Sequence, residues 1–249
     1  MMTEWLVEGD SLASAYHDAL WTLLVRGEIS PCPDYNTNQK ELSMTMVVEE
    51  PLAEPMISRC FIGGYKELEQ YRQEMLDGIL DFEVERGNWS YTYHQRMAGQ
   101  MPFIIAELRR NPDSRRAVID IRTADDMGSD DPACLQHIQY FIRNGKLHCK
   151  VLFRSNDACK ATFMNAFALI MLQKRIADEL GYKMGTYTHR ANSFHCYEKD
   201  LPLLAGYAQR ILSREGLTYN YEGEWDALME EAQPEIARMV EELKGRGGS

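Results

Sequence analysis

The segment from residue 135 to residue 181 limits the fold more than any other part of the chain. Two strand-like runs, HIQYFIR and KLHCKVLFR, flank Asn144-Gly145, the dipeptide that best fits a two-residue type I′ turn. The apolar run ACKATFMNAFALIMLQKRIADEL follows directly and stops at Gly181, which is typical of a helix that ends in a glycine. The segment therefore predicts an antiparallel hairpin followed by a long apolar helix.

The rest of the chain mixes helical and strand patterns without regular alternation. Apolar residues at helical spacing predict earlier helices over 11–26 (with Ser11 as N-cap), 66–80 and about 95–110. Alternating residues predict strands over 42–48, 117–123 and 186–198, and at least two helices close the chain. No repeat or linker divides the sequence, so we expect one domain over 1–249, with a disordered tail from about residue 245. The mixture predicts an α+β fold in which helices pack on a mostly antiparallel sheet.

Charge and composition argue against several functional classes. The net charge of −11 argues against a nucleic-acid partner, although a few arginines could still hold a small phosphorylated ligand. The N-terminus has no signal-peptide pattern, and the longest apolar cluster, FALIMLQ, is too short to cross a bilayer, so we expect no membrane contact. The six cysteines form no CxxC pair, which predicts no metal site and, without a secretory signal, a reduced cytoplasmic protein.

Two arginine-containing motifs could bind an anion. NPDSRR places Arg115 and Arg116 between a helix end and a strand, and RSND places Arg154, Ser155 and Asp157 just before the long helix. Guanidinium groups and a hydroxyl beside a helix N-terminus are suited to a phosphate monoester. The structural alternatives are solvated surface arginines and Asp157 as a simple helix cap.

A third motif could complete a nucleotide site. In HRANSFHCY, His195 and Tyr197 share one strand face and could bind ribose hydroxyls, unless they only form a half-buried face. Asn165 offers a donor and an acceptor to a base edge, and Cys134, at the entrance of a strand, offers a nucleophilic sulfur. Together the motifs predict a nucleotide-binding site that contains a thiol.

In their order and spacing, the motifs NPDSRR, PAC with QYFIRNGKL, RSND, FMNAFAL and HRANSFHCY resemble the thymidylate synthase family, which includes phage-type deoxycytidylate hydroxymethylases. The resemblance covers roughly residues 89–200, and WSYTYHQRM is similar to archaeal-type synthases. It implies a thymidylate-synthase-like mixed sheet, mostly antiparallel and covered by helices, through which two subunits dimerise. It also implies methylation of dUMP to dTMP, with 5,10-methylenetetrahydrofolate or a related tetrahydropterin as one-carbon donor.

The resemblance assigns the reacting groups. Cys134 matches the nucleophile that adds to C6 of the pyrimidine, so that C5 can attack the methylene group of the folate. Arg154 matches a phosphate ligand and is also a neighbour expected to lower the pKa of the thiol. Tyr91 matches the tyrosine near C5 that takes part in proton removal.

Other matched positions imply contacts with the phosphate and the ribose. Ser155 matches a phosphate ligand in the same subunit. Arg115 and Arg116 match the pair that reaches this phosphate from the partner subunit, which implies an obligate homodimer with shared active sites. His195 and Tyr197 match the contacts with the ribose 3′-hydroxyl.

Three further matches concern the base and the folate. Asn165 and Gln139 are the residues assigned to base recognition, and Asp157 matches the carboxylate that holds the pterin. A carboxamide at position 165 pairs with N3–H and O4 of uracil, whereas the cytosine-specific hydroxymethylases carry an acidic residue there. Asn165 therefore indicates a uracil nucleotide.

The sequence also departs from the family pattern. Leu135 replaces the usual histidine after the nucleophile, Asn192-Ser193 replaces Gly-Asp, and Ala161 replaces a glycine. Only Glu67 and Glu69 are candidates, both weak, for the glutamate that organises water for proton transfer.

The C-terminus departs most. The chain ends in ARMVEELKGRGGS instead of the small apolar residue with which a synthase closes over the folate. Closure excludes water, so its absence leaves a hydroxymethyl product on dUMP, dCMP or CMP open as an alternative. A catalytically silent nucleotide-binding homologue is the second alternative.

Overall fold

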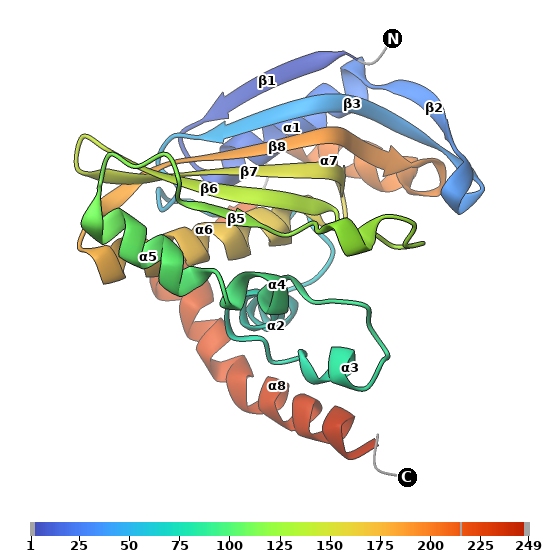
Figure 1. Cartoon of the computed structure of the whole chain (residues 1–249). Coiled ribbons are helices and arrows are strands. Elements are labelled where there is room, and N and C mark those ends of the chain that lie inside the picture. The colour runs from blue at the N-terminus through green and yellow to red at the C-terminus, as the bar shows by residue number, and fades with distance from the viewer. Residues whose placement is uncertain (1–2, 215, 247–249) are drawn as a thin grey trace.

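The computed structural model describes residues 3–214 and 216–246, and a seven-stranded mixed sheet forms its centre (Figure 1). The strand order is β1-β3-β8-β7-β6-β5, and β2 pairs with β3. The strands are β1 (Glu4–Gly9), β2 (Glu28–Cys32), β3 (Thr37–Val48), β5 (Val118–Asp120), β6 (Leu135–Arg143), β7 (Lys146–Asp157) and β8 (Lys183–Tyr197). Only β1–β3 and β7–β8 are parallel among these pairs, so the prediction of a mostly antiparallel sheet is confirmed.

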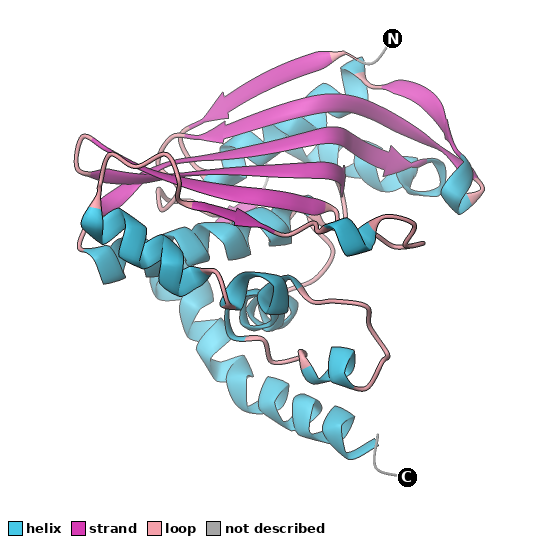
Figure 2. Ribbon diagram, viewed as in Figure 1, coloured by secondary structure: helices cyan, strands magenta, loops and turns pink. Residues whose placement is uncertain are grey.

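The helices gather on one side of this sheet (Figure 2). They are α1 (Leu12–Arg26), α2 (Tyr65–Asp77), α3 (Phe82–Glu85), α4 (Tyr93–Ala98), α5 (Met101–Arg110), α6 (Thr162–Leu180), α7 (Leu201–Ser213) and α8 (Asp226–Arg246). A small second sheet pairs β4 (Ile57–Ser58) with β9 (Thr218–Tyr219). Among the described residues, no helix is long and apolar enough to cross a membrane.

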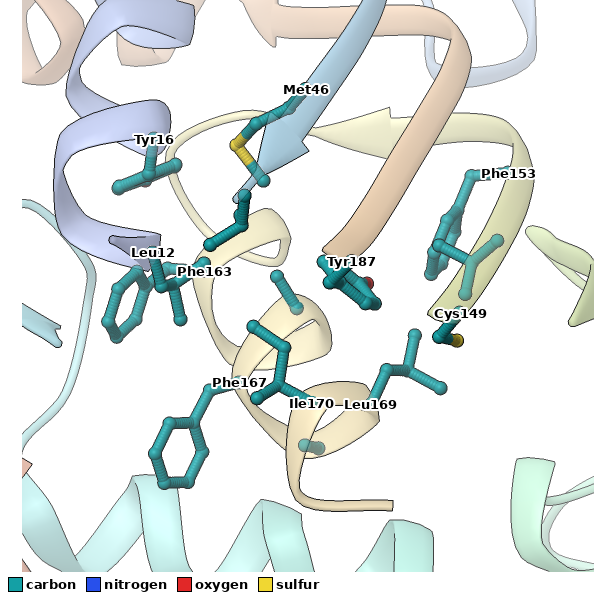
Figure 3. Packing of buried hydrophobic residues seen from close by; sticks show 14 of the residues in the cluster. Leu12, Tyr16, Met46, Cys149, Phe153, Phe163, Phe167, Leu169, Ile170 and Tyr187 are labelled. Atoms are coloured by element: carbon teal, nitrogen blue, oxygen red, sulfur yellow. The ribbon is translucent and has the colours of Figure 1, made fainter. Parts of the chain in front are cut away.

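The hairpin and the helix after it follow the sequence prediction. Asn144 and Gly145 adopt φ angles of 52° and 74°, as a type I′ turn requires, and join β6 to β7. Helix α6 ends at Gly181 with φ 74°. Leu169 of α6 lies toward the sheet residues Tyr187 and Cys149, whereas Phe163 packs against Tyr16 of α1, so α6 is part of the hydrophobic core on both sides (Figure 3).

Several boundaries differ from the prediction. The expected helix over about 95–110 is two helices, α4 and α5, because Pro102 lacks an amide donor and fits only the first turn of a helix. Helix α6 begins at Thr162 because the residues before it form a turn that Asp157 caps. Strands β1 and β2 were not predicted. Helix α8 continues through Arg246, past the expected start of the tail, and residues 247–249 lie outside the described part.

Candidate active site

Cys134 lies immediately before β6, where the chain enters the sheet. Its carbonyl oxygen accepts a hydrogen bond of 2.8 Å from the Arg154 amide, which joins this entrance to β7. Its side chain is partly exposed, whereas Cys60, Cys149 and Cys159 are buried. Ligands can therefore reach the thiol of Cys134, while these other thiols belong to the core.

The guanidinium of Arg154 holds the loop that leads to this thiol. Nε donates to the carbonyl of Ala133 at 3.2 Å, and Nη2 donates to that of Pro132 at 2.7 Å. Burial raises the pKa of the Cys134 thiol, and the Asp131 carboxylate adds to this, whereas the Arg154 charge acts in the opposite direction. Arg154 therefore lowers the thiol pKa as expected, but burial outweighs this effect, and the net pKa in the protein without ligand is raised.

Two tyrosines lie beside the thiol. Tyr93 Oη accepts the amide hydrogen of Leu135 at 3.4 Å, and the rings of Tyr91 and Tyr93 lie 5.8 Å apart. Burial raises the pKa of Tyr91 to about 12, and the neighbouring Asp131 and Cys134 add to the shift. Leu135 itself is fully buried in the core. A tyrosine hydroxyl from α4 thus provides a polar group at the position where Leu135 replaces a histidine.

Asn165 lies in the first turn of α6, with only 5% of its surface exposed. Its Oδ1 atom accepts a hydrogen bond from the hydroxyl of Tyr71, a residue of α2. Tyr71, Tyr91 and Tyr93 line the same cavity, of about 390 Å³, together with Asp131. The base-reading candidate is therefore connected to the tyrosines around the thiol through a residue that the sequence did not predict.

The parallel pairing of β7 with β8 brings two predicted ligands together. Asp157 pairs with His195, and His195 Nδ1 lies 3.4 Å from Ser155 Oγ and 3.3 Å from the Ser193 carbonyl oxygen. Burial lowers the pKa of His195, so the ring is neutral, and the Ser193 carbonyl keeps the proton on Nδ1. Nε2 is then an acceptor, and it is buried without a partner among the described residues. A sugar hydroxyl at this position would satisfy it.

Tyr197 and Asp157 border the same region. The rings of Tyr197 and His195 lie 4.8 Å apart at a steep angle. Burial raises the pKa of Tyr197, and Asp157 and Cys134 are among the neighbours that add to the shift. Asp157 Oδ1 accepts hydrogen bonds of 2.9 Å from the amides of Cys159 and Lys160. Asp157 therefore caps the turn before α6 with one oxygen and leaves the other free to bind a ligand.

Three predicted residues lie away from the thiol within one chain. The β5–β6 register pairs Asp120 with His137, which places Arg116 about 20 Å from Cys134 along the strands. Arg115 and Arg116 are exposed, and neither guanidinium forms a hydrogen bond or ion pair with a described residue. Gln139 faces away from Asn165, because the neighbouring residues on β6 point into the core, and its amide donates to the Arg115 carbonyl at 3.0 Å.

The two candidate glutamates are engaged elsewhere. Glu67 accepts a hydrogen bond of 2.8 Å from the Gly64 amide at the start of α2, and Glu69 is buried against Arg72 at 2.7 Å. Neither lines the cavity beside the tyrosines. The acidic groups that raise the pKa of tyrosines there are Asp131 and Asp126 for Tyr91, and Glu74 for Tyr71.

Helix α8 does not line the cavity beside the tyrosines. Helix α8 packs against α2 and extends below the sheet (Figure 1), and it contributes no residue to that cavity. Arg86 fixes its end by donating to the carbonyls of Leu243 at 2.9 Å and Lys244 at 2.5 Å. Helix α8 is therefore held away from this cavity.

Comparison with known proteins identifies the family. The family model described as "Thymidylate synthase" matches residues 66–222, which is more than half of the chain. The chain belongs to the thymidylate synthase family. The match includes all of the motifs on which the resemblance depended and extends it to α2, the helix that carries Tyr71.

Relatives within the family include archaeal proteins. A "Putative thymidylate synthase" of Methanocaldococcus jannaschii is 34% identical over 83% of this chain and 97% of its own length. A protein of Methanosarcina barkeri with the same description is 28% identical over 78% of this chain and 90% of its own. The "Thymidylate synthase" of Bacillus subtilis subsp. natto is 28% identical over 53% of this chain and 48% of its own.

A solved structure confirms the fold. Thermostable thymidylate synthase A from Bacillus subtilis superposes with a TM-score of 0.64, over 80% of this chain and 84% of that one, at 17% sequence identity. The thymidylate-synthase-like fold predicted from the motifs is therefore correct.

Proposed function

We propose that this protein transfers a one-carbon unit to C5 of a uracil nucleotide, converting dUMP to dTMP through a covalent bond between Cys134 and C6. The observation that carries the proposal is the convergence of an accessible thiol, a guanidinium, a ribose-binding pair and a carboxamide at one end of β6 and β7. Family membership supports the same chemistry.

The residues of this chain have distinct tasks in the proposed reaction. Arg154 and Ser155 bind the 5′-phosphate, and the phosphate places the base over Cys134. His195 accepts a hydrogen bond from the ribose hydroxyl through Nε2, and Tyr197 packs beside it. The thiol loses its proton when it adds to C6, because its pKa in the protein without ligand is raised. Tyr91 lies next to this thiol and takes part in proton removal from C5.

The one-carbon donor fits the side of the site where Asp157 lies. 5,10-Methylenetetrahydrofolate, or a related tetrahydropterin, would supply the methylene carbon and the reducing hydride. The free oxygen of the Asp157 carboxylate is suited to the N–H groups of a pterin. We infer a reducing compartment such as the cytoplasm, since all six cysteines are free thiols.

The proposed active site is shared between two subunits. Arg115 and Arg116 lie too far from Cys134 to bind the same phosphate within one chain, and their guanidinium groups have no partner among the described residues. A homodimer that packs the exposed face of the sheet against its copy could bring the pair to the partner's site. Gln139 lies on that same face, so its role in base recognition remains a prediction.

Product identification tests the proposal. The protein is incubated with methylenetetrahydrofolate and dUMP, UMP, dCMP or CMP in turn, and the new base is identified by mass. We expect thymidylate and dihydrofolate from dUMP, and no product from the Cys134→Ser variant. No product from any nucleotide, together with no adduct between Cys134 and 5-fluoro-dUMP, would favour a silent nucleotide-binding homologue.

A hydroxymethyl product is the second candidate, and one observation favours it. Helix α8 is anchored by Arg86 and contributes no described residue to the cavity beside Tyr91, so this helix does not exclude water from that cavity. A hydroxymethylated base accompanied by tetrahydrofolate would identify this activity.

A further inference from the structure

We propose that Tyr71 determines the base specificity of the site by fixing the orientation of the Asn165 carboxamide. This inference rests on the proposed function, because it assumes that Asn165 faces the pyrimidine. No sequence motif assigned a role to Tyr71, and its hydroxyl lies against the Asn165 side chain from a different helix.

The hydrogen bond between these residues distinguishes the two ends of the amide. Tyr71 donates to Oδ1, and Oδ1 is the only partner of this hydroxyl among the described residues. A rotation of the amide by 180° would put the Nδ2 donor group against the phenol and leave the phenolic hydrogen without an acceptor. Burial keeps the pKa of Tyr71 well above its ordinary value, so the hydroxyl stays protonated and remains a donor. The rotated amide is therefore disfavoured.

The other end of the amide is left available to a ligand. Asn165 Nδ2 has no partner among the described residues. It is not one of the polar atoms that are sealed from solvent without a partner; those are Tyr140 Oη, Gln173 Oε1 and His195 Nε2. Nδ2 can thus donate outward, while the second lone pair of Oδ1 can still accept a hydrogen bond.

This fixed pattern selects between pyrimidines. Uracil presents an O4 acceptor and an N3–H donor, which match Nδ2 and Oδ1 in the observed orientation. Cytosine presents an N4 amino donor and an N3 acceptor. In the observed orientation, its N4 donor would face the Nδ2 donor and its N3 acceptor would face the Oδ1 acceptor. An amide that could rotate freely would bind either base. Tyr71 prevents this adaptation, so it is a specificity-determining residue that acts through Asn165.

Equilibrium binding of dUMP and dCMP, without folate, to the full-length protein and the Tyr71→Phe variant tests the inference. Tyr71→Phe removes one hydroxyl and keeps the ring. We expect the preference for dUMP over dCMP to fall about tenfold, from weaker dUMP binding and stronger dCMP binding. Tyr65→Phe is the matched control, because it makes the same change on the same helix at a side chain that is 41% exposed. The control should keep the preference of the original protein.

A double substitution shows whether Tyr71 acts through Asn165. In the Asn165→Ala background, Tyr71→Phe should leave the ratio of the two dissociation constants unchanged. An unchanged preference in the single variant, or an equal fall in both backgrounds, would overturn the inference. Binding of dUMP without formation of any product would refute the proposed function, but the effect of Tyr71→Phe on the binding preference could still be measured. Failure to bind either nucleotide would overturn both. Thermal unfolding of each variant identifies any loss of fold.

Discussion

Arginines lie near both ends of strand β6, and they differ in exposure and in hydrogen bonding. At the entrance, Arg154 donates to two carbonyls of the loop before Cys134, close to partly buried tyrosines and a buried histidine. At the far end, Arg115 and Arg116 are exposed and bind no described side chain. The first end is an organised site, and the second is a set of donors without an acceptor among the described residues. In the proposed function, one chain contributes to two different active sites.

The largest expected effect concerns the entrance of β6. Cys134→Ser should lower the rate of product formation by a factor on the order of 10⁴ or more, because a hydroxyl is a far weaker nucleophile than a thiolate. The Cys149→Ala variant is a control for loss of a thiol, since Cys149 is buried in the core. Steady-state assays should find residual activity in the control; full activity of Cys134→Ser would refute covalent catalysis.

The second prediction concerns the far end of β6. Replacing both Arg115 and Arg116 with alanine should raise the KM for dUMP roughly 100-fold, because two charge-assisted hydrogen bonds to the phosphate are lost. When this variant is mixed and refolded with Cys134→Ser, heterodimers should contain one intact site, and activity should return to about a quarter of the original level. No recovery in the mixture would contradict a shared site.

The third prediction uses the raised pKa of the Cys134 thiol. The thiol is protonated at neutral pH, so its alkylation by iodoacetamide should accelerate as the pH rises through the raised pKa. Arg154→Gln removes the charge that opposes the shift, and its alkylation midpoint should lie at a still higher pH. Mass spectrometry of the Cys134 peptide separates this reaction from that of Cys32, which is also partly exposed. A midpoint that stays in place would show that Arg154 has no electrostatic effect on the thiol.

The smallest expected effect compares the stability of the two ends. Arg154→Ala removes the donor to the Pro132 carbonyl and one of two donors to the Ala133 carbonyl, and should lower the free energy of unfolding by about 1–2 kcal/mol. Arg116→Ala removes an exposed side chain that forms no hydrogen bond or ion pair with a described residue, and should change the free energy of unfolding by less than about 0.5 kcal/mol. Urea unfolding measures both values. Equal losses of unfolding free energy would show that Arg154 and Arg116 stabilise the fold to the same extent, contrary to this comparison.

Local signals predicted the centre of the fold well. The Asn144-Gly145 turn, the glycine end of α6 and the Ser11 cap depend on contacts within a few residues, and all three are present. Strands β1 and β2 were missed because their exposed positions include Leu6 and Ile29, and Pro31 interrupts β2, so neither strand has a polar side that marks it. Such edge strands are defined by pairing with β3.

The candidate site was predictable only where motifs carry it. The motifs placed Arg154 and Ser155 on one strand and His195 on another, and the structure pairs these strands with each other. Tyr71 gave no signal, since a tyrosine on an amphipathic helix is usually a packing residue, and its contact with Asn165 depends on how α2 packs on α6. The raised pKa of Cys134 was also missed, because burial is a tertiary property.

The hydrogen bonds of Arg154 also restrict how this site could change during evolution. One planar guanidinium supports the loop of the nucleophile and, in the proposed function, holds the phosphate. Lysine cannot replace it, because an ammonium group does not offer the same flat fork of donors. A substitution at position 154 would therefore remove both the support of the loop before Cys134 and a ligand of the phosphate. Selection for a new substrate would therefore act on the residues around the base, where Tyr71 and Asn165 can change without disturbing the nucleophile.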